Sequence, residues 1–75
     1  MDFDLLLDAK GLMCPEPGMM LHKKVKDLDS GQVLKLEATD PSTKRDVLKF
    51  CSFLGFELVL TDEIEGVFLF WLKKP

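Results

Sequence analysis

The sequence predicts an α+β fold, a two-layer sandwich in which two helices cover one face of a four-stranded mixed sheet. Four short apolar segments have the character of strands, and two amphipathic segments separate the first three of them. A chain of 75 residues is too short to cover both faces of a sheet with helices. The expected order is βαβαββ in one domain over residues 1–75, with the first two strands parallel and the last two forming a hairpin.

The first strand and the first helix are predicted from two different periodicities. Residues 3–8 alternate, so that every second side chain points to the same face, as in a strand. From 17 to 28 the apolar residues Leu21 and Val25 recur at helical spacing, and Ser30-Gly31 ends the helix.

The middle of the chain repeats this strand and helix pattern. Residues 33–39 alternate as a second strand. The helix expected over 43–54 places Val47, Phe50 and Cys51 on one apolar stripe, which we expect to face the sheet.

The last part of the chain predicts the hairpin. Residues 56–61 form its first strand, 62–66 a turn, and 67–73 its second strand. Leu69 and Trp71 lie on the opposite side of the last strand from its other large apolar side chains. This two-sided pattern indicates either an open apolar face that binds a partner or a central strand with both faces partly covered.

Composition and charge narrow the class of protein. Apolar residues make up 47% and charged residues 31% of the chain, which is typical of a globular domain. The net charge of −3 argues against direct nucleic-acid binding through a broad basic surface. The sequence contains no apolar run of the roughly 18 residues that span a membrane and no secretory signal pattern, so we expect a cytoplasmic protein with reduced thiols.

The motif Cys14-Pro15-Glu16-Pro17 is the strongest candidate for chemistry. Prolines suit the first turn of a helix, so Cys14 lies just before a helix start, where the dipole and the free N–H groups favour a thiolate. The fourth position holds Pro17 rather than a second cysteine, so no neighbouring thiol can displace a group carried on Cys14. The alternative is an inert, buried structural cysteine.

The other residues that could carry chemistry have simpler explanations. Cys51 lies on the inward stripe of its helix, which predicts a packing role and no disulfide with Cys14. Glu16 either moves a proton beside the thiol or only complements the helix dipole. His22 lies off the apolar stripe, which predicts a solvated side chain, and the spacing of cysteines and histidine predicts no metal site.

A candidate partner surface surrounds the thiol in the sequence. It consists of Leu12, Met13, Met19 and Met20, and Phe53 could extend it from the second helix. Methionines suit adaptable docking surfaces, although a residue such as Met20 is also suited to filling a gap in the core.

A basic cluster is expected along the first helix. Its members are Lys10, His22, Lys23, Lys24 and Lys26. Such a run either forms a solvated helix face or steers an acidic partner toward the thiol.

Taken together, these residues resemble the TusA-like (SirA-like) family of small sulfur-carrier proteins. The resemblance extends from about Leu7 to Lys73 and rests on Gly11-Leu12, Cys14-Pro15-Glu16-Pro17, Met19-Met20, Gly31, Asp40-Pro41-Ser42-Thr43-Lys44-Arg45-Asp46, Phe50-Cys51 and Gly55. The Asp40-Pro41 and Phe50-Cys51 pairs are similar to the TusA branch of that family.

The resemblance implies a sulfurtransferase relay, whether or not the carrier itself counts as an enzyme. Cys14 would receive sulfur from a cysteine desulfurase, carry it as a persulfide and pass it to an acceptor protein. The carrier would need no cofactor, since pyridoxal phosphate belongs to the donor. The path would end in 2-thiolation of the tRNA wobble uridine, or in cofactor synthesis or sulfur oxidation. Asp40 would orient the loop near the thiol or cap the second helix.

Two other functions remain open at this point. A similar topology occurs in an RNA-contacting domain of a bacterial translation initiation factor, which would make this chain a binding or regulatory module. A scaffold that joins partners through the open sheet face would work without the thiol. Only the carrier requires Cys14 for its function.

Overall fold

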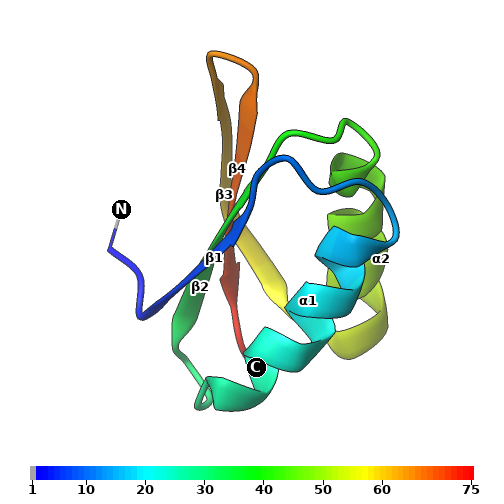
Figure 1. The fold of residues 1–75 in the computed structure, drawn as a ribbon. Coiled ribbons are helices and arrows are strands. Elements are labelled where there is room, and N and C mark those ends of the chain that lie inside the picture. The colour runs from blue at the N-terminus through cyan, green and yellow to red at the C-terminus, as the bar shows by residue number, and fades with distance from the viewer. Residues whose placement is uncertain (1) are drawn as a thin grey trace.

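The fold is a four-stranded sheet with two helices on one of its faces (Figure 1). The computed structural model describes residues 2–75, so Met1 of the expected domain lies outside the described residues. The elements are β1 (Leu5–Ala9), α1 (Glu16–Lys24), a short 3-10 helix η1 (Val25–Asp27), β2 (Val33–Ala38), α2 (Thr43–Leu54), β3 (Glu57–Ile64) and β4 (Val67–Lys73). Within this described part, neither helix is long and apolar enough to cross a membrane.

The sheet has the order β1-β2-β4-β3, which confirms the predicted mixed α+β sandwich. β1 pairs with β2 in parallel, and β4 pairs with both β2 and β3 in antiparallel orientation. In this register Leu7 lies opposite Leu36, and Leu36 lies opposite Phe70. These inward side chains pack against Leu21 of α1 and Val47 of α2 to form the core.

The central position of β4 explains why both of its sides are apolar. β4 lies between β2 and β3, so neighbouring side chains flank Leu69 and Trp71 on the face without helices. Both are more than nine-tenths buried, and the Lys35 ammonium lies 5.4 Å from the centre of the Trp71 ring. Of the two alternatives from the sequence, the partly covered central strand is the one that the structure bears out for these two residues.

The hairpin turn is shorter than predicted. β3 continues to Ile64, and the turn consists of Glu65 and Gly66, with φ angles of 51° and 80°. Two central residues with positive φ are typical of a type I′ turn, whose twist matches that of the paired strands. The acidic residues at 62 and 63 suggested a turn, but they lie on an exposed edge strand that tolerates charge.

The first strand and the first helix also differ from their predicted bounds. β1 begins at Leu5 rather than at residue 3, and α1 gives way to η1 at Val25 rather than continuing to 28. The Lys74 ammonium donates hydrogen bonds to the carbonyl oxygens of Val25 and Leu28, at 3.2 and 2.7 Å. A cation there satisfies carbonyl groups that a helix end leaves free, which explains why this segment ends where it does.

Candidate functional site

Cys14 lies in the loop between β1 and α1, and its side chain is exposed. Two hydrogen bonds join this loop to the segment that follows β2: Gly11 N–H donates to Thr39 Oγ1 at 2.9 Å, and Cys14 N–H donates to Asp40 Oδ2 at 2.7 Å. Because β1 and β2 are parallel, their carboxyl ends meet at the same edge of the sheet. The thiol is therefore held beside the starts of both helices.

Asp40 performs the first of the two roles that the sequence left open, because it orients the loop of the thiol; among the described residues no side-chain hydrogen bond caps α2. One carboxylate oxygen accepts from Cys14 N–H, and the other accepts from Ser42 N–H at 3.0 Å, where α2 begins. These two bonds hold the pKa of Asp40 below its ordinary value, and the bond from Cys14 contributes more than the bond from Ser42. The carboxylate therefore orients the loop of the thiol and also satisfies a backbone donor at the start of α2.

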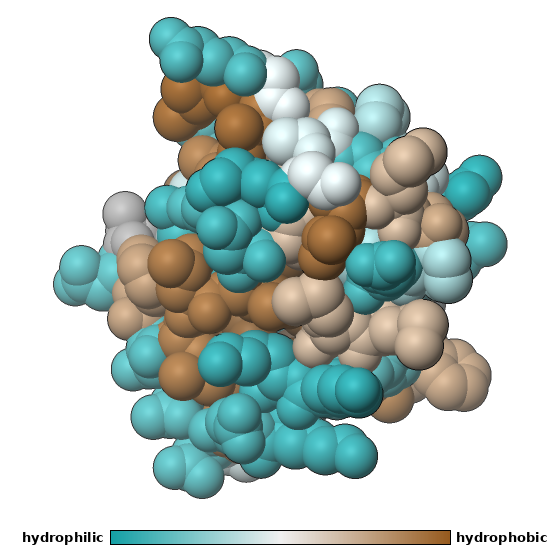
Figure 2. Space-filling model, in the orientation of Figure 1, coloured by the Kyte–Doolittle hydropathy of each residue, from teal (hydrophilic) through white to brown (hydrophobic). Residues whose placement is uncertain are grey.

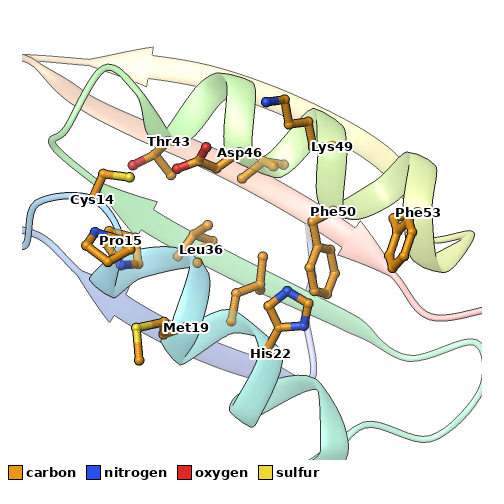
Figure 3. Close-up of a pocket in the computed structure, with 14 residues that line it drawn as sticks. Cys14, Pro15, Met19, His22, Leu36, Thr43, Asp46, Lys49, Phe50 and Phe53 are labelled. Carbon is orange, nitrogen blue, oxygen red and sulfur yellow. The ribbon is translucent and has the colours of Figure 1, made fainter.

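A groove runs from Cys14 between α1 and α2, above β2 (Figure 3). Its volume is about 390 Å³, and most of its surface is apolar. The lining residues that Figure 3 labels are Cys14, Pro15, Met19, His22, Leu36, Thr43, Asp46, Lys49, Phe50 and Phe53. The thiol lies at one end of the groove and Phe53 at the other, so a group bound along the groove would reach the sulfur.

The start of α1 offers the sulfur fewer donors than the sequence suggested. Pro15 and Pro17 have no N–H, and the N–H of Glu16 donates to the carbonyl oxygen of Met13 at 3.0 Å. Among residues 2–75, Gly18 N–H is the donor of this turn that makes no backbone hydrogen bond. The prolines shape the loop and begin the helix, but they also remove the backbone donors that were expected to face Cys14.

The candidate partner surface divides into an exposed part and a packed part. Met13 and Met19 are 75% and 58% exposed, whereas Leu12 and Met20 are partly buried and pack against the core. Phe53 is 88% exposed at the other end of the groove. Figure 2 shows apolar surface over the helices, bordered by hydrophilic side chains. We use the name "groove rim" for Met13, Met19 and Phe53: Met19 and Phe53 line the groove, and the exposed Met13 precedes Cys14 in the loop.

His22 has a contact that its position in the sequence did not reveal. Its side chain is exposed, as expected, but the ring meets Phe50 edge to face at 4.9 Å between centroids, and it lines the groove. Asp46 and Lys49 line the groove as well, although no sequence pattern distinguished them. They line the same groove as the thiol because α2 packs beside α1.

Thr43 is a further groove residue that sequence reasoning missed. The sequence placed it in the turn that starts the second helix, where a threonine commonly caps the backbone. In the structure its side chain does not cap α2; it is buried and lines the groove with Cys14. Its position at a helix start after Asp40 is visible in the sequence, but its place beside the loop of the thiol comes from the tertiary packing.

Cys51 lies in the core, as its stripe predicted. Burial raises the pKa of its thiol, so this cysteine favours the protonated form. Both cysteines are free thiols. Among residues 2–75 there is no group of three or more His, Cys, Asp or Glu side chains placed to hold a metal ion.

The predicted basic cluster is not one surface. Lys10 lies apart from the helix and pairs with Glu37 at 2.8 Å and with Asp8 at 3.5 Å. The hydrogen bond to Glu37 contributes most to raising the pKa of Lys10. The remaining basic side chains, His22 to Lys26, belong to α1 and η1, so any steering of an acidic partner would come from that face alone.

Comparison with known proteins gives a consistent result. Residues 6–74 match the family model described as sulfurtransferase TusA. The sulfur carrier protein TusA of Pseudomonas savastanoi pv. phaseolicola is 61% identical over 71 residues, which cover 95% of this chain and 84% of that protein. The protein of the same name from Pseudomonas putida KT2440 is 58% identical, over 95% of this chain and 89% of its own.

A solved structure shares the fold. A SirA-like protein from Desulfitobacterium hafniense superimposes with a TM-score of 0.81 and covers 93% of this chain and 96% of its own. Its sequence identity is 20%, so this likeness concerns the fold alone.

Proposed function

The chain belongs to the TusA family of sulfurtransferases, and we propose that it relays sulfur as a persulfide on Cys14. The supporting observation is an exposed thiol at the end of an apolar groove, while the other cysteine of the chain is buried in the core. The exposed sulfur is open to a donor. In the described part of the chain the other thiol, Cys51, is buried in the core, so it does not stand beside Cys14 to displace the cargo.

The proposed chemistry is an exchange of sulfur between thiolates. The Cys14 thiolate attacks the terminal sulfur of a donor persulfide, the new S–S bond forms, and the donor's S–S bond breaks with its electron pair leaving on the donor thiolate. In the second step an acceptor thiolate attacks the terminal sulfur on Cys14, and Cys14 leaves as a thiolate. Each step begins and ends with one thiolate and one persulfide, so it needs no oxidant or reductant.

The groove rim is the proposed docking surface for both exchange partners. Met13 and Met19 lie on the side of the thiol, and Phe53 lines the far end of the groove, so a partner that covers all three would exclude water from the sulfur. In this proposal the donor is a cysteine desulfurase, which brings its own pyridoxal phosphate, and the acceptor is a second protein with a reactive cysteine.

The destination of the sulfur belongs to the proposal as well. The resemblance supports 2-thiolation of the tRNA wobble uridine, with cofactor synthesis or sulfur oxidation as the alternative. The relay would operate in the cytoplasm, because a reducing compartment keeps Cys14 as a free thiol.

Intact-protein mass measurement tests the relay. We expect that incubation with a cysteine desulfurase, pyridoxal phosphate and cysteine adds one sulfur to the wild type and to Cys51→Ser, but none to Cys14→Ser. Reductant should remove the added sulfur. Uptake by Cys14→Ser, or no uptake by the wild type from any competent desulfurase, would contradict the proposal.

A further inference from the structure

The hydroxyl group of Thr43 is buried and has no hydrogen-bond partner. The residue is 2% exposed, and among residues 2–75 its Oγ1 contacts no donor or acceptor within hydrogen-bonding geometry. A buried hydroxyl without a partner is costly and uncommon in native proteins. A valine has nearly the same shape and would fill this position without that cost, so the hydroxyl calls for a functional explanation.

The hydroxyl group is directed toward the thiol. Thr43 and Cys14 line the same end of the groove, and Figure 3 shows the oxygen of Thr43 pointing toward the sulfur of Cys14. Asp40 holds both residues in this relation: its carboxylate accepts from Cys14 N–H at 2.7 Å, and its carbonyl oxygen accepts from Thr43 N–H at 3.0 Å.

The unloaded thiol does not use this donor, but a persulfide would extend toward it. No hydrogen bond joins Thr43 Oγ1 to Cys14 Sγ within the described residues. A second sulfur on Cys14 lies about 2 Å beyond the first, which is the length of an S–S bond. When the persulfide is ionised, its terminal sulfur carries the negative charge.

Few other donors are available for that charge at the start of α1. Its first turn contains Pro17, and the N–H of Glu16 already binds the carbonyl oxygen of Met13. Thr43 is instead the first residue of α2, so its hydroxyl lies at the positive end of a helix of 12 residues. Hydrogen bonds to charged groups contribute more than those between neutral groups.

We propose that the Thr43 hydroxyl donates a hydrogen bond to the terminal sulfur of the Cys14 persulfide, so that Thr43 binds the cargo and favours the loaded form of the protein over the unloaded form. This inference rests on the proposed function. It assigns the sulfur-binding role to a residue of the second helix, which lies 29 positions after the cysteine in the chain.

The test measures an exchange equilibrium with glutathione persulfide as the donor. All variants carry Cys51→Ala, which leaves Cys14 as the single thiol. The Cys14 thiolate and glutathione persulfide form the Cys14 persulfide and the glutathione thiolate, and intact mass gives the loaded fraction at a fixed ratio of the two glutathione species. Thr43→Val should shift this equilibrium toward the unloaded form by roughly tenfold, the effect of losing one hydrogen bond to a charged group.

Matched variants separate the hydroxyl from the shape of the side chain. Thr43→Ser keeps the donor and should load like the wild type. Ser42→Ala removes a neighbouring hydroxyl that is also buried but does not line the groove, and it should load normally. The rate at which iodoacetamide alkylates unloaded Cys14 should be the same in Thr43→Val and the wild type, whereas a merely structural role for Thr43 would change it.

Each other outcome overturns the inference. If the wild type loads and Thr43→Val loads equally well, the hydroxyl does not bind the cargo, although the proposed relay survives. If Thr43→Ser behaves like Thr43→Val, the methyl group rather than the hydroxyl matters. If the wild type accepts no sulfur from glutathione persulfide or from a desulfurase, the relay and this inference fail together.

Discussion

One end of the groove and the core beneath α2 each hold one thiol, and the two thiols differ in their exposure to solvent. Cys14 lies in a loop, exposed, at the end of an apolar groove. Cys51 lies on the buried stripe of a helix, where burial raises the pKa of its thiol. The local backbone and its solvent access thus decide whether a cysteine is available to react or only packs.

The two cysteines also differ in the interactions that hold them in place. Cys51 is held by helix hydrogen bonds and by apolar neighbours such as Val47 and Phe50 in the core. Cys14 is held by one polar contact, the bond from its N–H to the Asp40 carboxylate. An apolar core excludes a partner, whereas a loop anchored by its backbone leaves the side chain free to meet one.

The largest difference is expected in reactivity toward a small alkylating reagent. Cys14 in the folded protein should react with iodoacetamide on the order of a hundredfold faster than Cys51, because Cys51 becomes accessible only when the structure opens locally. Peptide mapping after timed labelling measures both rates in one sample. In denaturant the two rates should converge, and a fast reaction of native Cys51 would remove the distinction between the two regions.

A smaller effect is expected on partner binding when a side chain of the groove rim is removed. Phe53→Ala should weaken binding of the desulfurase that loads Cys14 by roughly tenfold, as the loss of an aromatic side chain from an interface commonly does. Because Phe53 is 88% exposed, its removal should leave the stability of the fold unchanged. The measurement is the Kd of the desulfurase for each variant.

The matched control for this prediction lies on the sheet. Ile64→Ala removes another exposed apolar side chain, 54% exposed at the end of β3 near the hairpin turn. Its Kd should equal that of the wild type. Equal weakening by both variants would mean that docking does not depend on the groove rim.

The smallest effect is expected on the free energy of unfolding when Cys51 is replaced. Cys51→Ser places a hydroxyl among apolar side chains and should lower the free energy of unfolding by about 1 kcal/mol at pH 7, without affecting sulfur uptake on Cys14. Urea denaturation measures the difference. A loss of sulfur uptake in a variant that is still folded would show that Cys51 takes part in the relay.

The stability of the wild type and of Cys51→Ser should depend differently on pH. Because burial raises the pKa of Cys51, the folded chain keeps this proton at pH values where the unfolded chain has lost it. The wild type should therefore lose stability relative to Cys51→Ser as the pH rises through and above the ordinary thiol value of 9.0. Below that value the difference between the two proteins should be constant.

The sequence determined most of the fold and identified Cys14 as the candidate for chemistry, because both depend on local patterns. Periodicity gave the order of strands and helices, and the stripe that contains Cys51 placed it inside. Prolines beside Cys14 indicated a loop before a helix, where a side chain stays accessible. Where local signals competed, as in the acidic residues before Glu65, the strand pairing with β4 decided the boundary.

Only the tertiary structure decided which residues surround the thiol. Asp40 was suspected to act near Cys14, but its two hydrogen bonds exist because parallel pairing brings the ends of β1 and β2 together. The groove exists because α1 and α2 pack side by side on one face of the sheet. The same packing brings Thr43 and His22 into its lining. Contacts between segments far apart in the chain leave no periodic trace in the sequence. The candidate reactive atom could therefore be predicted from local pattern, whereas its surroundings could not.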